Sequence, residues 1–389
     1  MANSNLPNDV PGKVELHYPT DDESSDEIPS GEEEDSDDNV PLSILFPKKS
    51  KSSKIAEETP KWTKTFTDIS MTERTTGYEA RMEKMVEAVK NDNPVQTFER
   101  MFDDKVIKLI VEQSNIYALQ KNRHGFSVSG DEIKTFLGVL LLSGYHRLPR
   151  EPMYWSDDED VSVPFVASSI SRNRFQEIKR FLHIADNSKL DKTDKMYKLR
   201  PLMNLLNENF RQWGILHQNF SIDEAMVKYF EHHSGKQFIR GKPVRFGFKN
   251  WMICSSTGYC YKYDTYCGAK VGNAGNNSLP LGSRVVLELL QCVDQPSDHI
   301  MFCDNFFSSY NLMKTLKGMK IRATGTVREN RTKKCPLSSV KQMQKMERGV
   351  FEKMYDMKNN LLFVRWKDNS VVTMVTNYDT VEPLETVKR

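Results

Sequence analysis

The sequence predicts an α/β protein whose central sheet carries an aspartate on each of two strands. Residues 220–227 alternate between apolar and polar positions around Asp223, as a half-buried strand does. Residues 300–302 form a short apolar run that ends at Asp304, which is typical of a buried strand closing at its C-terminal end. Open α/β sheets place their functional groups at this edge, so Asp304 is a candidate site residue, and Asp223 is a second candidate carboxylate on another strand.

The segments between and after the two aspartates predict the rest of the sheet. Residues 246–255 and 259–267 have strand character and are joined by a tight turn, which indicates a hairpin. Residues 284–292 carry apolar side chains at helical spacing. After the second aspartate, Ser308 and Ser309 offer an N-cap for a further helix, and residues 321–327 form the next strand.

The order of these elements is that of a ribonuclease H-like sheet, in which the first and fourth strands lie side by side. Asp223 and Asp304 would then face each other across neighbouring strands. Two carboxylates at that spacing suit Mg²⁺, and metal-bridged carboxylates suit phosphoryl transfer. The alternative is that Asp304 and Asn305 form only a turn.

Four longer motifs make the chain resemble the piggyBac transposase family, and the domesticated piggyBac-derived proteins of animal genomes above all. The motifs are Ser-Ile-Asp-Glu-Ala-Met at residues 221–226 and the segments 241–251, 303–308 and 325–331, and the similarity runs from about Pro94 to the end. The resemblance implies a transposase core of the DDE/DDD type. In that core, Asp223 and Asp304 match the first two catalytic, metal-binding aspartates.

The third aspartate of the family lies in a Gly-Val-Asp motif beyond the strand that matches residues 370–377, and the sequence given ends at Arg389 without it. The Cys/His-rich zinc module of the family is not present either. We therefore expect a DNA-binding protein that does not catalyse transposition, with weak or vestigial Mg²⁺ binding and no zinc. Two alternatives remain open: Mg²⁺-dependent DNA cleavage and strand transfer by a full-length form, and a nuclear interaction protein acting through an acidic tail.

Charge is divided unevenly along the chain. Residues 1–45 hold thirteen Asp and Glu and one Lys, so the remainder carries 54 Lys and Arg against 40 Asp and Glu, a net charge of +14. A basic body favours a polyanion such as double-stranded DNA, although a well-solvated basic surface is the alternative. Residues 1–90 are expected to be a disordered acidic tail that binds other proteins, and a basic cluster at 47–54 suggests a nuclear localisation signal.

Residues 91–219 predict a helical region. Apolar residues recur at helical spacing from Phe98 to Ile116, and the helix after Ser171 carries Arg172 and Arg174 away from its apolar stripe. The resemblance implies that this region serves dimerisation and DNA binding, so a homodimer and DNA contacts by these two arginines are expected. Pattern alone leaves ordinary solvated charge as the alternative.

Basic residues also flank the predicted sheet of residues 220–330. Lys242, Arg245 and Lys249 alternate with phenylalanines, and we interpret these bases as phosphate contacts and the phenylalanines Phe246 and Phe248 as core. Arg328 and Arg331 follow the last strand of this sheet and are expected to contact DNA phosphates near the two aspartates. Residues 331–389 resemble the β-containing insertion of the family, with strands at 361–366 and 371–376.

Six cysteines occur without any C-x-x-C pair, and most fall within predicted strands or helices. We therefore expect small apolar core residues rather than a zinc site or disulfides. The longest apolar run, residues 136–142, is too short to cross a bilayer, so no membrane contact is expected.

Overall fold

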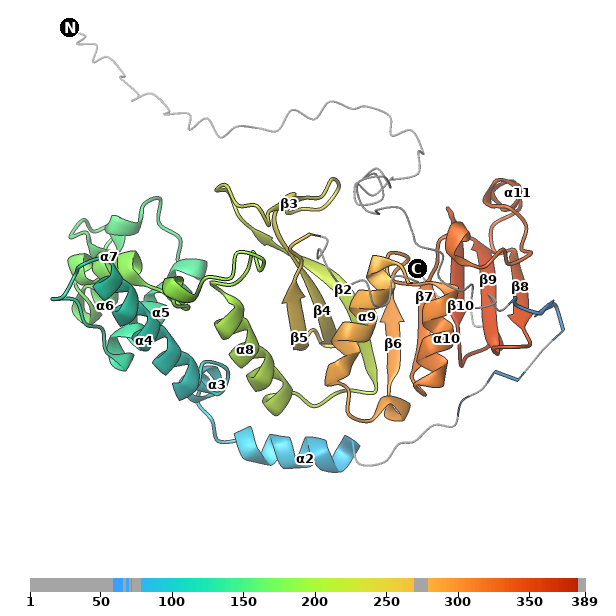
Figure 1. Cartoon of the computed structure of the whole chain (residues 1–389), viewed down its shortest axis with the longest axis horizontal. Coiled ribbons are helices and arrows are strands. Elements are labelled where there is room, and N and C mark those ends of the chain that lie inside the picture. Colours follow the sequence, from blue (N-terminus) through green and yellow to red (C-terminus); the bar gives the residue numbers. More distant parts are fainter. Residues whose placement is uncertain (1–58, 66–67, 70, 72–77, 269–278, 384–389) are drawn as a thin grey trace, which may run out of the picture. The chain divides into compact units, whose positions relative to one another are not determined.

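The computed structural model describes residues 59–65, 68–69, 71, 78–268 and 279–383. Ten of the described segments form one mixed sheet with the order β1-β8-β9-β10-β7-β6-β2-β4-β3, and β5 pairs with β4 (Figure 1). The strands are β1 (Trp62–Thr63), β2 (Asn219–Lys228), β3 (Gln237–Phe238), β4 (Phe246–Ser255), β5 (Cys260–Thr265), β6 (Ile300–Cys303), β7 (Arg322–Thr326), β8 (Phe351–Asp356), β9 (Leu361–Lys367) and β10 (Val371–Thr376).

Parallel pairing is confined to the centre of this sheet. The strands β2, β6 and β7 run parallel to one another, and the remaining pairs are antiparallel. The predicted adjacency of the two aspartate-bearing strands is confirmed, because β2 and β6 are direct neighbours. The predicted strands at 361–366 and 371–376 are confirmed as well, but β10 pairs with β7, so the chain beyond residue 330 continues the same sheet.

Two helices cover one side of the central strands, α9 (Leu281–Leu289) and α10 (Tyr310–Gly318). Their apolar faces are fully buried at Val286, Leu312 and Leu316, and each such side chain contributes about 1.5–3 kcal/mol to folding. The predicted N-cap is confirmed: the Ser309 hydroxyl accepts a hydrogen bond from the Leu312 amide at 3.1 Å. This cap starts α10 immediately after the loop that carries Asp304.

The helix α9 also lies directly against that loop. A Cβ atom at Gly282 would come within 2.3 Å of the Phe306 carbonyl oxygen, so only glycine fits there. Close packing of α9 therefore fixes the backbone that follows the second aspartate. This contact is one reason why the loop after Asp304 has a defined conformation.

Residues 94–213 form helices around a second apolar core. The core includes Ile133, Phe136, Phe175 and Ile178, each nearly completely buried. The helices are α3 (Pro94–Met101), α4 (Asp104–Gln120), α5 (Gly130–Tyr145), α6 (Pro164–Ser169), α7 (Arg172–Phe181) and α8 (Arg200–Trp213). Shorter helical turns are η1 (Glu151–Trp155), η2 (Asn187–Lys189), η3 (Leu290–Cys292), η4 (Pro296–Asp298), η5 (Glu329–Arg331) and α11 (Val340–Gln344).

Polar contacts connect α8 to the edge strand β5. The Asn207 side chain donates to the Tyr263 carbonyl and accepts from its amide, both at 2.9 Å. Arg200 bridges Asp194 and Asp264, at 2.9 and 2.8 Å. These bonds replace the strand partner that β5 lacks on this side, among the residues that the structure describes.

The expectation that residues 1–90 are disordered throughout is wrong for part of that range. Residues 62–63 form β1, which pairs with β8, and α2 (Tyr78–Val89) is helical. The Trp62 ring meets those of Tyr310 and Phe363 edge-on, and this aromatic contact explains why a polar stretch becomes ordered. The acidic residues and the basic cluster at 47–54 lie outside the described residues. Among the described residues, no helix has the length and apolar character needed to cross a membrane.

Candidate functional site

Asp223 lies within β2 at the level where the parallel neighbour β6 ends, and Asp304 directly follows β6. Ile222 of β2 is paired with Cys303 of β6, and each aspartate is the next residue of its chain. Both aspartates are exposed. An Oδ1 atom of each accepts a backbone amide, from Glu224 at 2.8 Å and from Phe306 at 2.9 Å, which limits the directions in which the carboxylates can turn.

The surroundings of both carboxylates disfavour their ionised form. Desolvation by the surrounding protein raises the pKa of Asp223, and the negative charges of Glu224 and Asp304 add to this effect. Desolvation likewise raises the pKa of Asp304, together with the charge of Glu224. Carboxylates that share a site in this way are stabilised in their charged form by a cation, so the donor set fits Mg²⁺, which needs only one or two carboxylates and keeps several waters.

Glu224 is neutralised from within the chain. Lys242, in the loop between β3 and β4, places its Nζ 2.9 Å from Oε1 of Glu224. The hydrogen bond with Glu224 also raises the pKa of Lys242. The base that the sequence suggested as a phosphate contact thus lies beside the aspartates. Across the described part of the chain, no group of three or more His, Cys, Asp or Glu residues is arranged to hold a metal ion.

Lys249 does not occupy the surface position that we expected from the sequence. Its side chain is only 8% exposed, and its Nζ lies 4.1 Å from the ring centre of Trp251 and 4.7 Å from that of Phe306. The strand explains this placement, because Lys249 shares its face of β4 with the buried Trp251 and Ile253. Lys249 therefore packs against the loop after Asp304 through the ring of Phe306. The alternation of residues along β4 was the sequence pattern that indicated its burial.

Arg328 and Arg331 lie beside the second aspartate. Arg328 Nε donates to Asn305 Oδ1 at 3.3 Å, and Arg331 donates to the carbonyl oxygens of Asn305 at 3.2 Å and of Phe306. Both arginines are half-buried. The strand β7, which precedes them, is the parallel neighbour of β6, so the position inferred from the sequence agrees with the geometry. Contact with DNA phosphates stays a prediction.

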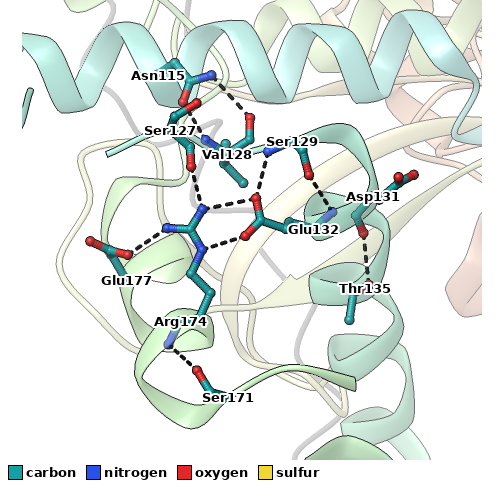
Figure 2. Close-up of polar contacts among 10 residues, drawn as sticks. All are labelled: Asn115, Ser127, Val128, Ser129, Asp131, Glu132, Thr135, Ser171, Arg174 and Glu177. Atoms are coloured by element: carbon teal, nitrogen blue, oxygen red, sulfur yellow. Dashed lines mark hydrogen bonds and ion pairs between the residues drawn. The ribbon is translucent and has the colours of Figure 1, made fainter. Parts of the chain in front are cut away.

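Arg174 takes part in a network within the helical region (Figure 2). Its Nε and Nη2 donate to the two carboxylate oxygens of Glu132 at 2.7 and 3.1 Å, Nη1 reaches Glu177 at 2.7 Å, and Nη2 also reaches the Ser127 carbonyl. Glu132 belongs in turn to the capping box of α5 with Ser129. Arg174 therefore joins α7 to the start of α5, and this role replaces our interpretation of it as a DNA contact. Arg172 is exposed.

The two phenylalanines that we interpreted as core behave differently. Phe248 packs between the rings of Tyr229 and His233, with centroids 5.0 and 5.1 Å away. Phe246, by contrast, is 51% exposed, so its assignment to the core is wrong. Arg245, the residue before it, is exposed as expected.

Comparison with known proteins identifies the class first. Residues 93–389 match the family model described as Transposase IS4, which places the chain among transposase-derived proteins. Together with the human relatives and the solved structure that follow, this match shows that the chain belongs to the piggyBac transposase family.

The human relatives show the family in more detail. PiggyBac transposable element-derived protein 2 of Homo sapiens is 38% identical over 299 residues, covering 76% of this chain and 50% of that protein. PiggyBac transposable element-derived protein 3 of Homo sapiens is 36% identical over 400 residues, covering 98% of this chain and 65% of that protein. The chain thus spans between half and 65% of the length of these curated relatives.

A solved structure has the same fold. The cryo-EM structure of a piggyBac transposase synaptic complex with hairpin DNA matches with a TM-score of 0.66 and 25% identity, covering 77% of this chain and 64% of that chain.

Proposed function

We propose that this chain is a transposase-derived protein that binds double-stranded DNA at the edge formed by Asp223 and Asp304. The observation that carries the proposal is the register of these two aspartates, with Arg328 and Arg331 bonded to the loop beside them. A ribonuclease H-like core is part of the proposal. It is supported by the strand order β5-β4-β2-β6-β7 with parallel pairing of the last three. The solved relative is a piggyBac transposase in a synaptic complex with hairpin DNA, and this supports DNA as the partner.

The aspartates would hold a hydrated Mg²⁺, which when bound neutralises charge on a phosphate. Two-metal strand cleavage needs further carboxylates to hold a second ion close by. Glu224 is the third acidic residue here, and it is engaged by Lys242. On the described residues we therefore infer binding without cleavage. Mg²⁺-dependent DNA cleavage and strand transfer by a longer form is the second candidate, favoured by the convergence of the two aspartates.

The DNA would contact exposed or half-buried bases around this edge and on the helical region. Arg245, Arg328 and Arg331 are candidates near the aspartates, and Arg172 is the candidate on α7. The family relationship supports a homodimer through the helical region and a nuclear location, with the acidic residues 1–45 as a surface for other proteins. The proposed DNA contacts rest on the positive charge balance of the chain beyond residue 45.

The test is a salt titration of DNA binding with the full chain. Fluorescence anisotropy with a labelled random-sequence duplex should give an affinity that falls linearly on logarithmic axes, with a slope of about −0.9 for each phosphate neutralised. Four arginine contacts predict a slope of about −3 to −4. A salt-independent affinity, or no binding at low salt, would rule out the proposal.

A further inference from the structure

The paired ends of β2 and β4, together with β3, form an arm of residues 226–248 at the edge of the sheet (Figure 1). Three phenylalanines of this arm are exposed: Phe230 at 78%, Phe238 at 54% and Phe246 at 51%. Phe238 and Phe246 are cross-strand partners, and their ring centroids are 4.7 Å apart. Large aromatic side chains rarely gather on a surface without a binding role.

These phenylalanines are not needed to hold the arm together. The contacts of Phe248 with Tyr229 and His233 give the arm a small core of its own. A Cβ atom at Gly247 would lie 1.9 Å from the Val227 carbonyl oxygen, which shows how closely the two backbones approach. The arm is thus a supported surface, and removing an exposed ring should leave its backbone in place.

The surroundings of the exposed rings are cationic. Residues 228–245 contain five Lys and Arg and one acidic residue, Glu231. Lys228 Nζ lies 4.8 Å from the ring centre of Phe230, and Lys236 Nζ lies 5.4 Å from that of Phe246. Aromatic rings flanked by positive charge match nucleic acid that presents both phosphates and unstacked bases. A rim of one sign also disfavours docking of a second copy of the arm.

The arm is connected to the aspartate edge through Lys242. This residue bonds to Glu224, the neighbour of Asp223, and it precedes Phe246 by four residues. Four residues of extended chain span at most about 14 Å. A DNA strand whose phosphate lies at the aspartates would therefore have its neighbouring nucleotides within reach of the exposed rings.

We propose that the arm binds unpaired DNA bases next to the aspartate edge, with Phe238 and Phe246 as the stacking surface and Phe230 beside them. This inference rests on the proposed function, which supplies the DNA, and adds a preference for unpaired nucleotides. Stacking tolerates any base, since every base has an aromatic face. The preference should therefore depend on single-stranded character and not on sequence.

The experiment compares two labelled DNAs with the full-length chain in EDTA: a blunt duplex, and the same duplex with four unpaired nucleotides at one 3′ end, including 2-aminopurine. The wild-type protein should bind the extended DNA at least about fivefold more tightly, the low end for one stacked base, and should quench the 2-aminopurine fluorescence. The Phe238→Ala/Phe246→Ala variant should lose both effects while its affinity for the blunt duplex changes less than about twofold. Phe246→Trp should retain both effects, because the indole also stacks.

Phe165→Ala is the matched control, since Phe165 is 79% exposed on α6 and should leave both effects unchanged. Equal binding of both DNAs by the wild-type protein would overturn this inference and leave the proposed function standing. Retention of the preference and the quenching in the double variant would overturn it too, and would assign the exposed rings to another partner such as a protein. Binding of the unpaired strand without any duplex binding would instead support the arm and contradict the proposed function.

Discussion

Asp223 and Asp304 stand at equivalent positions on neighbouring strands, because the residues directly before them, Ile222 and Cys303, are paired across β2 and β6. Both side chains have raised pKa values, with desolvation as the main cause. The folded protein therefore keeps two carboxylates in a place that disfavours their charge. Groups held at such a cost to stability are typical of binding and catalytic sites.

The first prediction concerns this cost. Asp304→Asn should raise the melting temperature in EDTA at pH 7. The pKa of Asp304 is higher in the folded than in the unfolded chain, so stability declines as pH rises from the ordinary value of 3.8 through the raised value. The increase in melting temperature that Asp304→Asn causes should therefore become smaller as the pH falls toward 4. Differential scanning calorimetry at several pH values measures it.

The same variant tests cation binding. Mg²⁺ should raise the melting temperature of the wild-type protein and not that of Asp304→Asn, because a ligand stabilises only the state that binds it. Asp157→Asn, at an exposed position of the helical region, is the control and should behave like wild type. A lower melting temperature for Asp304→Asn in EDTA would show that the carboxylate contributes more through its hydrogen bonds than it costs through its charge.

The second prediction concerns Arg328 and Arg331. Replacing both with alanine should weaken binding to all duplexes alike and reduce the salt slope by about 2, close to one unit for each lost phosphate contact. The measurement is the salt titration described above.

Arg348→Ala/Lys353→Ala removes the same charge from residues that already pair with Asp368 and Glu382. This control should leave the slope nearly unchanged. If Arg328→Ala/Arg331→Ala also leaves the salt slope unchanged, the two arginines do not contact phosphates. Their role would then be to hold the loop at Asn305 and Phe306.

The third prediction separates Arg174 from Arg172. Arg174→Ala should lower the free energy of unfolding by about 2 kcal/mol, because Glu132 and the Ser127 carbonyl lose charge-assisted hydrogen bonds. Arg174→Lys should recover only part of the loss, since an ammonium cannot reproduce the two-pronged contact. Arg172→Ala should leave stability unchanged and lower the salt slope by about 1. The reverse pattern, with Arg174 changing the slope and Arg172 the stability, would contradict the roles that we assign here.

The strands that carry the two aspartates could be predicted from the sequence, because period-two alternation and short apolar runs fix the faces and ends of strands. Their adjacency is inferred from the likeness of the element order to a ribonuclease H-like sheet, and the pairing of β2 with β6 confirms it. The connection of β10 to β7 could not be predicted, since strand pairing over a distance depends on tertiary packing that local patterns do not encode. The ordering of Trp62 depends likewise on rings that lie far away in the sequence.

For the candidate site, the sequence predicted the positions of the carboxylates better than those of the basic side chains. Asp304 follows the end of β6 and Asp223 lies within β2, one residue beyond the last pair of β2 with β6, so strand positions locate both carboxylates. A lysine or arginine can instead extend along apolar surface or turn inward to a carboxylate, so its Cα position does not fix where its charge lies. Lys249 over Trp251 and Arg174 at Glu132 are the two cases here. For Lys249 the missing signal was Trp251 on the same face of β4, and for Arg174 it was Glu177, one helical turn away, whereas Glu132 lies on another helix.

The last prediction is that the chain as given does not cut DNA. In our proposal Asp223 and Asp304 hold one hydrated Mg²⁺ or Mn²⁺, whereas a second ion close by would need more negative charge than the described residues provide. A supercoiled plasmid incubated with the protein and Mn²⁺ should therefore be nicked no faster than with the Asp223→Ala/Asp304→Ala variant. Metal binding alone would not distinguish DNA binding from DNA cleavage, because a single ion at two carboxylates is compatible with either function. Metal-dependent nicking by the wild-type chain that this variant abolishes would show that two aspartates suffice, and would replace binding with cleavage as the function of the site.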